Sequence, residues 1–372
     1  MILQSKKVWI RDMLRPAQIC VEGGKITKIQ EYGLEQPDRD YGDKMILPGF
    51  IDSHTHGHKG VDSMTANTEE YRIWQKEIVK EGVTSFAIAT DTVSEADNIA
   101  MLERTSEAVG GDDCAEILSI YIEGNFINTE CRGAHNEKLI APPNVEQLKK
   151  YIKAANGTLK RMILAVELDK DFEVLKYALE HGIAVSLGHS AAPYEVAKRA
   201  IELGADGLTH VYNGMKQFHH REPSLVGIAF NEPNVYAEII ADGHHVCWPA
   251  VQTLCKAKDE NHLVLVTDAS PYKGYDGPLQ EGVYIDEEGQ FRTLDGSLCS
   301  SSLKMNEGVR NLIFYGQASF TQAINSATIN PARMLGVDDR KGSIKEGKDA
   351  DIVVVDDEFE VLQCYCRGTE ML

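Results

Sequence analysis

The sequence predicts an α/β fold: a (β/α)8 TIM-type barrel with a small β-sandwich formed by both termini of the chain. Between about residues 49 and 335, short apolar runs alternate with amphipathic helical segments, which is the pattern of repeated βα units around a parallel sheet. Eight such runs are present, the number of strands in a closed barrel. Towards both ends of the chain, apolar and polar residues alternate with period two instead, which is typical of β-strands with one exposed face.

The eight apolar runs are the expected barrel strands, and helix-ending signals separate several of them. Asn67, with Glu70 three residues later, forms a capping-box pattern before the first helix, and Gly82 stands where that helix should end. Gly182 and Gly204 mark two similar helix ends. The expected strands are residues 50–56, 84–90, 117–124, 161–168, 184–190, 207–213, 235–242 and 262–269.

Segments 2–30 and 342–363 lack helical periodicity and contain glycine turns between alternating runs. Because they lie at opposite ends of the chain, we expect them to pair into one discontinuous unit beside the barrel. Residues 282–296 have a central turn with alternating flanks, which predicts a hairpin after the eighth strand. The predicted boundaries are 1–47 with 337–372 for the small domain and 48–336 for the barrel.

Composition excludes several classes of partner. The 372 residues, 43% of them hydrophobic, suffice for a large core. A formal net charge of -19 argues against nucleic acid or an anionic membrane as partner, and an anionic substrate would need a locally positive pocket. The eight cysteines form no CxxC pairs and are expected to be free thiols. With no signal-like or membrane-spanning apolar stretch, we expect a cytoplasmic protein.

Residues of metal-binding types stand where five of the apolar runs end. The carboxyl ends of parallel barrel strands meet at one rim, so these side chains should converge there. Imidazole nitrogen and carboxylate oxygen are the donors of catalytic divalent metal sites. The residues are His54 and His56, Glu123, His189, His210 and Asp268.

His54 and His56 are two apart on a strand, so both project to one face and can share one ion. An HxH pair is also common by chance, and ordinary polar loop residues are the alternative interpretation. Glu123 could bridge two ions, or it could be an ion-paired loop carboxylate. Glu167, at the end of the fourth expected strand, competes with Glu123 for this role.

His189 and His210 end adjacent expected strands, and together with Glu123 they would supply three ligands and leave a position for water. A single histidine in such a position is more often a satisfied core residue. Asp268 is the candidate proton carrier. A metal site that activates water, together with a carboxylate that carries the proton of that water, predicts hydrolysis of a C–N bond. A helix N-cap is its alternative role. Dinucleotide, Walker-type and GxSxG patterns are absent from the sequence.

The motifs match a known family in sequential order. The matching segments are LPGFIDSHTHG, IEGNFIN, GAHN, SLGHS, THVYNGM, REPSLVG, IIADGHHV, LVTDA, GSLCSSSLKMNEGVRNL, INPARMLG and GSIKEGKDADIVV. With these segments the chain resembles the N-acetylglucosamine-6-phosphate deacetylases of the amidohydrolase superfamily. The resemblance implies metal-dependent release of acetate from a 6-phosphorylated N-acetyl amino sugar, with the galactosamine epimer as the close alternative substrate.

Two other functions are weighed against this one. Cyclic amide hydrolases and adenine-type deaminases of the superfamily commonly need a carbamylated lysine at the end of the fourth strand. This chain has Ala165, Val166 and Glu167 there, which disfavours them. A catalytically silent binding protein on the same barrel is the third hypothesis, and the filled ligand positions disfavour it.

The resemblance also assigns residues. It makes Glu123, His189 and His210 the principal metal ligands, which favours Glu123 over Glu167, and it makes Asp268 the catalytic aspartate. His54 and His56 then become a conditional second site, so one or two ions are expected per subunit. Zinc is expected first, with iron, manganese or cobalt as alternatives.

Substrate contacts and a homodimer follow from the same resemblance. Arg221 and His245 are the candidates for phosphate contacts that cross between neighbouring subunits. Arg221 offers a planar fork of donors that suits phosphate oxygens. The full set of expected substrate contacts is His135, Asn213, Gly214, Arg221 and His245.

The chain departs from the family pattern at three places. Asn125 stands where proline usually follows the Glu-Gly pair, and Gly214 stands where alanine is frequent. Residues 272–279 match no family segment. We expect these positions to lie near the sugar, so the preferred epimer stays open.

Overall fold

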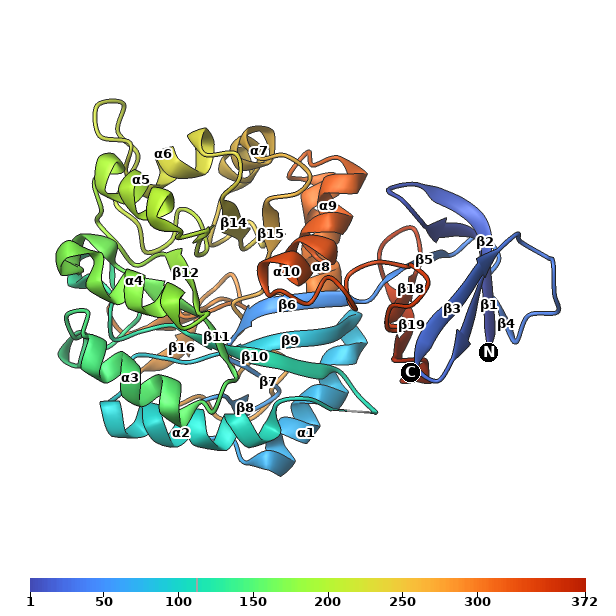
Figure 1. The fold of residues 1–372 in the computed structure, drawn as a ribbon, viewed down its shortest axis with the longest axis horizontal. Coiled ribbons are helices and arrows are strands. Elements are labelled where there is room, and N and C mark those ends of the chain that lie inside the picture. Colours follow the sequence, from blue (N-terminus) through green and yellow to red (C-terminus); the bar gives the residue numbers. More distant parts are fainter. Residues whose placement is uncertain (112) are drawn as a thin grey trace.

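The computed structural model describes residues 1–111 and 113–372, and its larger part is a barrel of eight parallel strands with helices outside (Figure 1). Neighbouring strands pair in chain order, and a parallel bridge between Thr55 and Ala269 joins the first strand to the segment after the last. All eight predicted strands are confirmed. They are β6 (Phe50–Thr55), β9 (Val83–Ala89), β10 (Glu116–Ile122), β11 (Leu159–Leu164), β12 (Ala184–Leu187), β13 (Gly207–Leu208), β14 (Tyr236–Ile239) and β15 (Leu263–Leu265).

Several helix ends lie at the predicted signals, although α1 ends at Glu77 and a 3-10 helix continues it to Gly82. The Asn67 side chain accepts hydrogen bonds from the backbone of Glu69 and Glu70, and the Glu70 carboxylate accepts one from the Asn67 N–H at 2.8 Å, so the capping box is formed. Gly204 ends α5 with a left-handed φ of 119°. The helices are α1 (Thr68–Glu77), α2 (Glu95–Ala108), α3 (Val145–Ala154), α4 (Glu173–Glu180), α5 (Tyr194–Leu203), α6 (Ser224–Asn231), α7 (Trp248–Ala257), α8 (Met305–Phe314), α9 (Phe320–Ser326) and α10 (Ile329–Met334).

Short elements decorate the barrel. The predicted hairpin after β15 is present as β16 and β17, which pair in antiparallel register. Short 3-10 helices occupy several loops, and the first of them ends at Gly82, as predicted. These elements are β7 (Gly57–His58), β8 (Val61–Asp62), β16 (Val283–Ile285), β17 (Phe291–Thr293), η1 (Ile78–Glu81), η2 (Thr129–Cys131), η3 (Glu137–Leu139), η4 (Val166–Leu168) and η5 (Lys170–Phe172).

Both ends of the chain build a second sheet beside the barrel (Figure 1). The segment β5 pairs in parallel with β1 and antiparallel with β18, which joins the two halves. The sheet curls so that the Ile26 N–H donates to the Lys348 carbonyl at 2.9 Å. The strands thus form one curved sheet around its own apolar cluster. They are β1 (Ile2–Trp9), β2 (Leu14–Glu22), β3 (Lys25–Gln30), β4 (Arg39–Asp40), β5 (Met45–Pro48), β18 (Ile352–Val355), β19 (Val361–Cys366) and β20 (Thr369–Glu370).

Burial explains why the barrel strands read as nearly continuous apolar runs. Every residue of β6 and of β9 is buried, because each strand faces the barrel interior on one side and helices on the other. Among the described residues, no helix has both the length and the apolar content that crossing a membrane requires. The exact domain limits at residues 47 and 337 stay a prediction.

Candidate metal centre and substrate pocket

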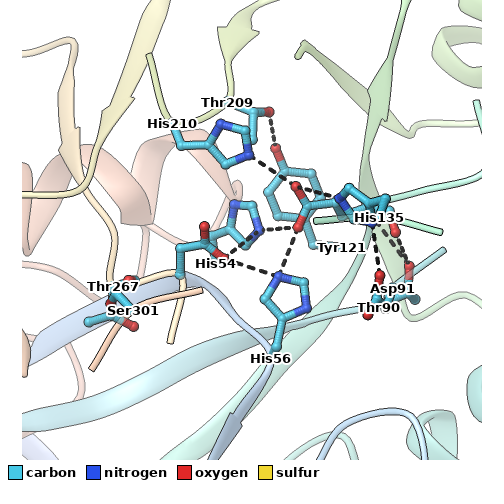
Figure 2. Close-up of polar contacts among 12 residues, drawn as sticks. His54, His56, Thr90, Asp91, Tyr121, His135, Thr209, His210, Thr267 and Ser301 are labelled. Atoms are coloured by element: carbon cyan, nitrogen blue, oxygen red, sulfur yellow. Dashed lines mark hydrogen bonds and ion pairs between the residues drawn. The ribbon is translucent and has the colours of Figure 1, made fainter. Parts of the chain in front are cut away.

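The predicted metal-type residues meet at the carboxyl ends of the barrel strands. Figure 2 shows His54, His56 and His210 directed at a common centre. The ligand atoms fall into two overlapping groups, and within each group they all lie within 4.8 Å of one another. One group is Glu123, His189 and His210, and the other is His54, His56, Glu123 and Asp268.

Glu123 is shared by both groups and is almost fully buried. Its Oε1 lies 3.0 Å from His210 Nε2 and 3.1 Å from His189 Nε2. Its Oε2 lies 2.8 Å from the Nε2 atoms of both His54 and His56. Because each oxygen faces a different pair of imidazoles, this carboxylate has the geometry of a bridge between two cations.

Glu167 lies outside this cluster. It sits in η4, where its carboxylate accepts hydrogen bonds from the Ala191 N–H and the Ser190 hydroxyl, both at 2.6 Å. It therefore holds the segment that follows β12 and contributes no atom to either group. The choice of Glu123 over Glu167 agrees with this geometry.

Asp268 faces the second group across the cavity. Its Oδ1 lies 3.1 Å from His56 Nε2 and 3.8 Å from His54 Nε2. Burial alone would raise the pKa of Asp268, but the hydrogen bond with His56 and the positive charge of His54 bring it below its ordinary value. An ionised carboxylate can accept a proton, as a general base must. Residues 269–282, all of them described, contain no helix, so the alternative role as an N-cap is wrong.

Three of these residues have left-handed backbone conformations. The φ angles are 45° at His189, 28° at His210 and 48° at Asp268. Such angles cost about 1–3 kcal/mol each for residues with a side chain, and they persist only where surrounding contacts impose them. Here the His189 carbonyl accepts from the Asn128 N–H at 2.8 Å, and the Asp268 N–H donates to the His54 carbonyl at 2.9 Å.

Outer contacts orient the imidazoles. His189 Nδ1 lies 2.8 Å from the Cys131 carbonyl oxygen, which can only accept, so Nδ1 carries the hydrogen and Nε2 presents its lone pair. Burial lowers the pKa of His189 to about 4, so the ring is neutral near pH 7. Imidazole nitrogens that converge on carboxylate oxygens match the donor set of a catalytic divalent metal, and we conclude that these residues fit such an ion.

On His54 and His56, the neighbouring carboxylates have the opposite effect and raise the pKa. Burial opposes the charged form of His56, but hydrogen bonds to Asp268 and Glu123 raise its pKa to about 9. The pKa of His54 is also raised, against burial, by the charge of Glu123. Protons held this way by carboxylates mark a place with strong negative potential, which a divalent cation would occupy by displacing them.

A cavity of about 420 Å³ opens over the metal residues. Four of the five predicted substrate contacts line it, together with Asp268. Its lining also includes polar side chains from the hairpin segment, so the insertion after β15 forms one wall. The predicted contacts in the lining are His135, Asn213, Gly214 and His245.

His135 is held between the loop after β9 and the metal cluster. Its Nδ1 lies 2.8 Å from Asp91 Oδ1 and its Nε2 lies 3.9 Å from Glu123 Oε1. Burial opposes protonation, but the hydrogen bond to Asp91 raises the pKa of His135 to about 10. Its charged ring can therefore donate to a substrate oxygen. His245 is paired in a similar way with Asp242, with Nδ1 and Oδ2 2.6 Å apart.

Arg221 is not part of this cavity. It lies in an exposed loop, where its guanidinium contacts His220 Nε2 at 2.9 Å, and it is absent from the cavity lining. Among the described residues that line the cavity, none is arginine or lysine. The role of Arg221 in binding an anionic substrate stays a prediction.

Several lining residues were missed from the sequence. Asp91 directly follows the second expected strand, and Asp268 stands near the end of the eighth, so the same signal would have found Asp91. Tyr272 and Gln280 belong to the unmatched segment after β15, where no pattern pointed to them. Glu238 contacts His54 from inside the barrel, and its position in the middle of β14 gave no sequence signal.

Two of the three departures from the family pattern, Asn125 and Gly214, differ in their structural setting. Asn125 has a left-handed φ of 54° and is not among the residues that line the cavity, and its place relative to the sugar stays a prediction. Gly214 does line it, and a Cβ there would lie 2.6 Å from His189 Nδ1. Glycine at this position therefore lets the backbone approach a metal-type histidine.

Comparison with known proteins identifies the family. The profile of the amidohydrolase family matches residues 45–371. This chain belongs to the amidohydrolase family. It is 35% identical to an N-acetylglucosamine-6-phosphate deacetylase of Bacillus subtilis over 96% of the chain and 93% of the relative. It is 33% identical to an N-acetylgalactosamine-6-phosphate deacetylase of Escherichia coli O157:H7 over 98% of the chain and 96% of the relative.

Solved structures agree with this assignment. The structure of N-acetylglucosamine-6-phosphate deacetylase from Thermotoga maritima is 28% identical and superposes with a TM-score of 0.89, covering 100% of this chain and 99% of that one. The enzyme from Mycobacterium smegmatis is 25% identical with a TM-score of 0.92, and both chains are covered completely. The predicted family and barrel fold are thus confirmed.

Proposed function

We propose that this protein is a metal-dependent hydrolase that converts N-acetylglucosamine-6-phosphate and water into glucosamine-6-phosphate and acetate. The observation that carries the proposal is the placement of Asp268 beside the shared carboxylate of Glu123, at the base of a polar cavity. Support comes from the deacetylases that match the chain over nearly its whole length.

Glu123, His189 and His210 would hold one divalent ion, and His54 and His56 would hold a second with Glu123 and Asp268. Zinc suits this nitrogen and oxygen donor set. When bound, the metal polarises the acetamide carbonyl and makes water more acidic.

Asp268 accepts a proton from the attacking water as its oxygen bonds to the carbonyl carbon. The same carboxyl group then delivers that proton to the sugar nitrogen as the C–N bond breaks. His135, charged and 3.9 Å from Glu123 at the cavity wall, donates to the carbonyl oxygen as it gains negative charge.

The phosphate requires a cation, and neither arginine nor lysine is among the described residues that line the cavity of one subunit. The exposed Arg221 loop can supply it if a second copy of the chain docks against the cavity mouth, and we propose a homodimer of this kind. We also propose that the protein works in the reducing cytoplasm, which suits its eight free cysteines.

Acetate release tests the proposal. Zinc-loaded protein should release acetate from N-acetylglucosamine-6-phosphate, and Asp268→Asn should lower kcat roughly 10²-fold or more, because an amide cannot accept the proton. The metal content of both proteins is measured on the same samples. Unchanged turnover in the variant would rule out Asp268 as the proton carrier.

Two alternative substrates are separated in the same assay. The Escherichia coli relative makes N-acetylgalactosamine-6-phosphate the second candidate, so both epimers are compared, each with and without its phosphate. Faster hydrolysis of a cyclic amide than of either sugar phosphate would contradict the proposal. Such an activity is disfavoured because Glu167 stands in η4 after β11, where those relatives commonly need a lysine.

A further inference from the structure

A buried carboxylate inside the barrel has no part in the mechanism above. Glu238 lies in β14 and is 1% exposed. Its Oε2 lies 3.2 Å from His54 Nδ1 and 3.4 Å from the backbone nitrogen of His210. Its Oε1 has no hydrogen-bond partner among the described residues. An unpaired polar atom in the interior costs free energy, so the presence of this buried carboxylate calls for a functional or structural explanation.

The His54 ring is held between two carboxylates. Its Nδ1 faces Glu238, and its Nε2 lies 2.8 Å from Glu123 Oε2 on the cavity side. A carboxylate only accepts hydrogen bonds, so Glu238 keeps the ring hydrogen on Nδ1. The hydrogen between Nε2 and Glu123 is the one that a cation would displace, so Nε2 is the nitrogen that would offer its lone pair, and the ring cannot turn its other nitrogen towards the cavity without losing the bond to Glu238.

The two groups of ligands differ in the acceptor that faces the outer nitrogen of a histidine. Behind His189 stands a neutral backbone carbonyl, that of Cys131. Behind His54 stands a full carboxylate, which also adds negative charge close to the second group. Two divalent ions a few ångströms apart repel each other, so an extra buried negative charge beside one group favours double occupancy.

We propose that Glu238 is a positioning residue that makes the second ion bind at His54, His56 and Asp268. The inference rests on the proposed metal dependence and deepens it. It makes the number of bound ions depend on a side chain that contacts no substrate. A purely structural role for Glu238 would change the stability of the barrel and leave the affinity of the second ion unaltered.

Zinc titration of the metal-free protein tests this directly. The wild type should bind two ions per subunit. In Glu238→Leu, which is similar in size but has no acceptor, the dissociation constant of the second ion should rise about 10-fold to 100-fold while that of the first is unchanged. Glu238→Gln keeps an acceptor oxygen and should fall between the wild type and the leucine variant.

Two controls separate positioning from folding. Glu167→Gln also removes a carboxylate charge near the site, but its partners are Ser190, the Ala191 backbone and the Asn128 side chain, none of them a proposed metal ligand, so it should keep both ions. In a His54→Asn background, Glu238→Leu should cause a smaller further loss of zinc affinity than in the wild type, because only the effect of its charge remains once His54 is gone. Thermal unfolding of the metal-free proteins shows whether each variant folds.

The outcomes are distinct. A wild type that binds a single ion, a leucine variant that keeps both affinities, or equal weakening of both ions would each overturn the proposal. If Glu238→Leu fails to fold, the glutamine variant and its His54→Asn double variant decide the question by the same criteria. Metal binding is measured without substrate, so failure to release acetate would count against the proposed function alone.

Discussion

At the scale of single residues, Asn125 shows how a side chain can shape the pocket from outside it. Its amide nitrogen donates to the carbonyls of Val93 and Leu139, both at 2.8 Å, and its oxygen accepts from Asn98 at 2.6 Å. These bonds tie the loop after β10 to the loop after β9. The φ of 54° is accessible to asparagine, whereas proline is fixed near −65°, so this loop conformation excludes the proline that is usual in the family.

Replacing Asn125 with proline should therefore be costly. We expect Asn125→Pro to lower the free energy of unfolding by about 3 kcal/mol or more, because it imposes the wrong φ and removes buried hydrogen bonds. Urea unfolding measures this. Asn125→Gly is the matched control, since glycine accepts the φ but lacks the amide, and it should lose less. Equal stability of the two variants would show that the backbone conformation is not the cause.

At the scale of elements, the sequence predicts the strands well because their signal is local. Each barrel strand is a short apolar run whose end carries a polar residue, and the closed topology then brings Glu123, His189 and His210 together. The positions that escape prediction depend on three-dimensional neighbours. Glu238 looks like any polar residue of an alternating strand, and the exposure of Arg221 follows from the path of its loop.

The unmatched segment after β15 is held by a buried ion pair. Lys273 Nζ lies 2.9 Å from Glu81 Oε2, and both side chains are less than 5% exposed. The Glu81 carboxylate also accepts from the Met305 N–H at 3.2 Å, at the start of α8. The pair thereby fixes Tyr272, which directly precedes Lys273 and lines the cavity. The segment thus has a structural anchor, although no family pattern describes it.

Removing one partner of this pair should destabilise the protein. Lys273→Met leaves the Glu81 carboxylate buried without its cation, and we expect the free energy of unfolding to fall by roughly 3–5 kcal/mol. The double variant Lys273→Met/Glu81→Gln should regain a large part of the lost free energy of unfolding, because no unpaired charge is then buried. Urea unfolding measures both proteins. A single variant as stable as the wild type would contradict the idea that the pair anchors this segment.

At the scale of the whole molecule, an ion network connects the terminal sheet to the barrel. Glu116 begins β10, and its carboxylate lies 2.6 Å from Arg340 and 2.8 Å from Lys341. Lys341 is buried and also contacts Asp349 at 3.1 Å and Asp351. Arg340, Lys341 and both aspartates precede β18 in the chain, so the C-terminal part of the terminal sheet is joined to the barrel through charges as well as apolar contacts.

Lys341→Met should weaken this junction. Several carboxylates would share a buried site without their central cation, so we expect the terminal sheet to detach before the barrel unfolds, giving two unfolding steps and faster proteolysis within residues 342–372. Lys6→Met is the control, because its pair with Asp43 is largely exposed and contributes less than about 1 kcal/mol. Unfolding of Lys341→Met in one step, with wild-type protease resistance, would show that apolar packing alone holds the sheet to the barrel.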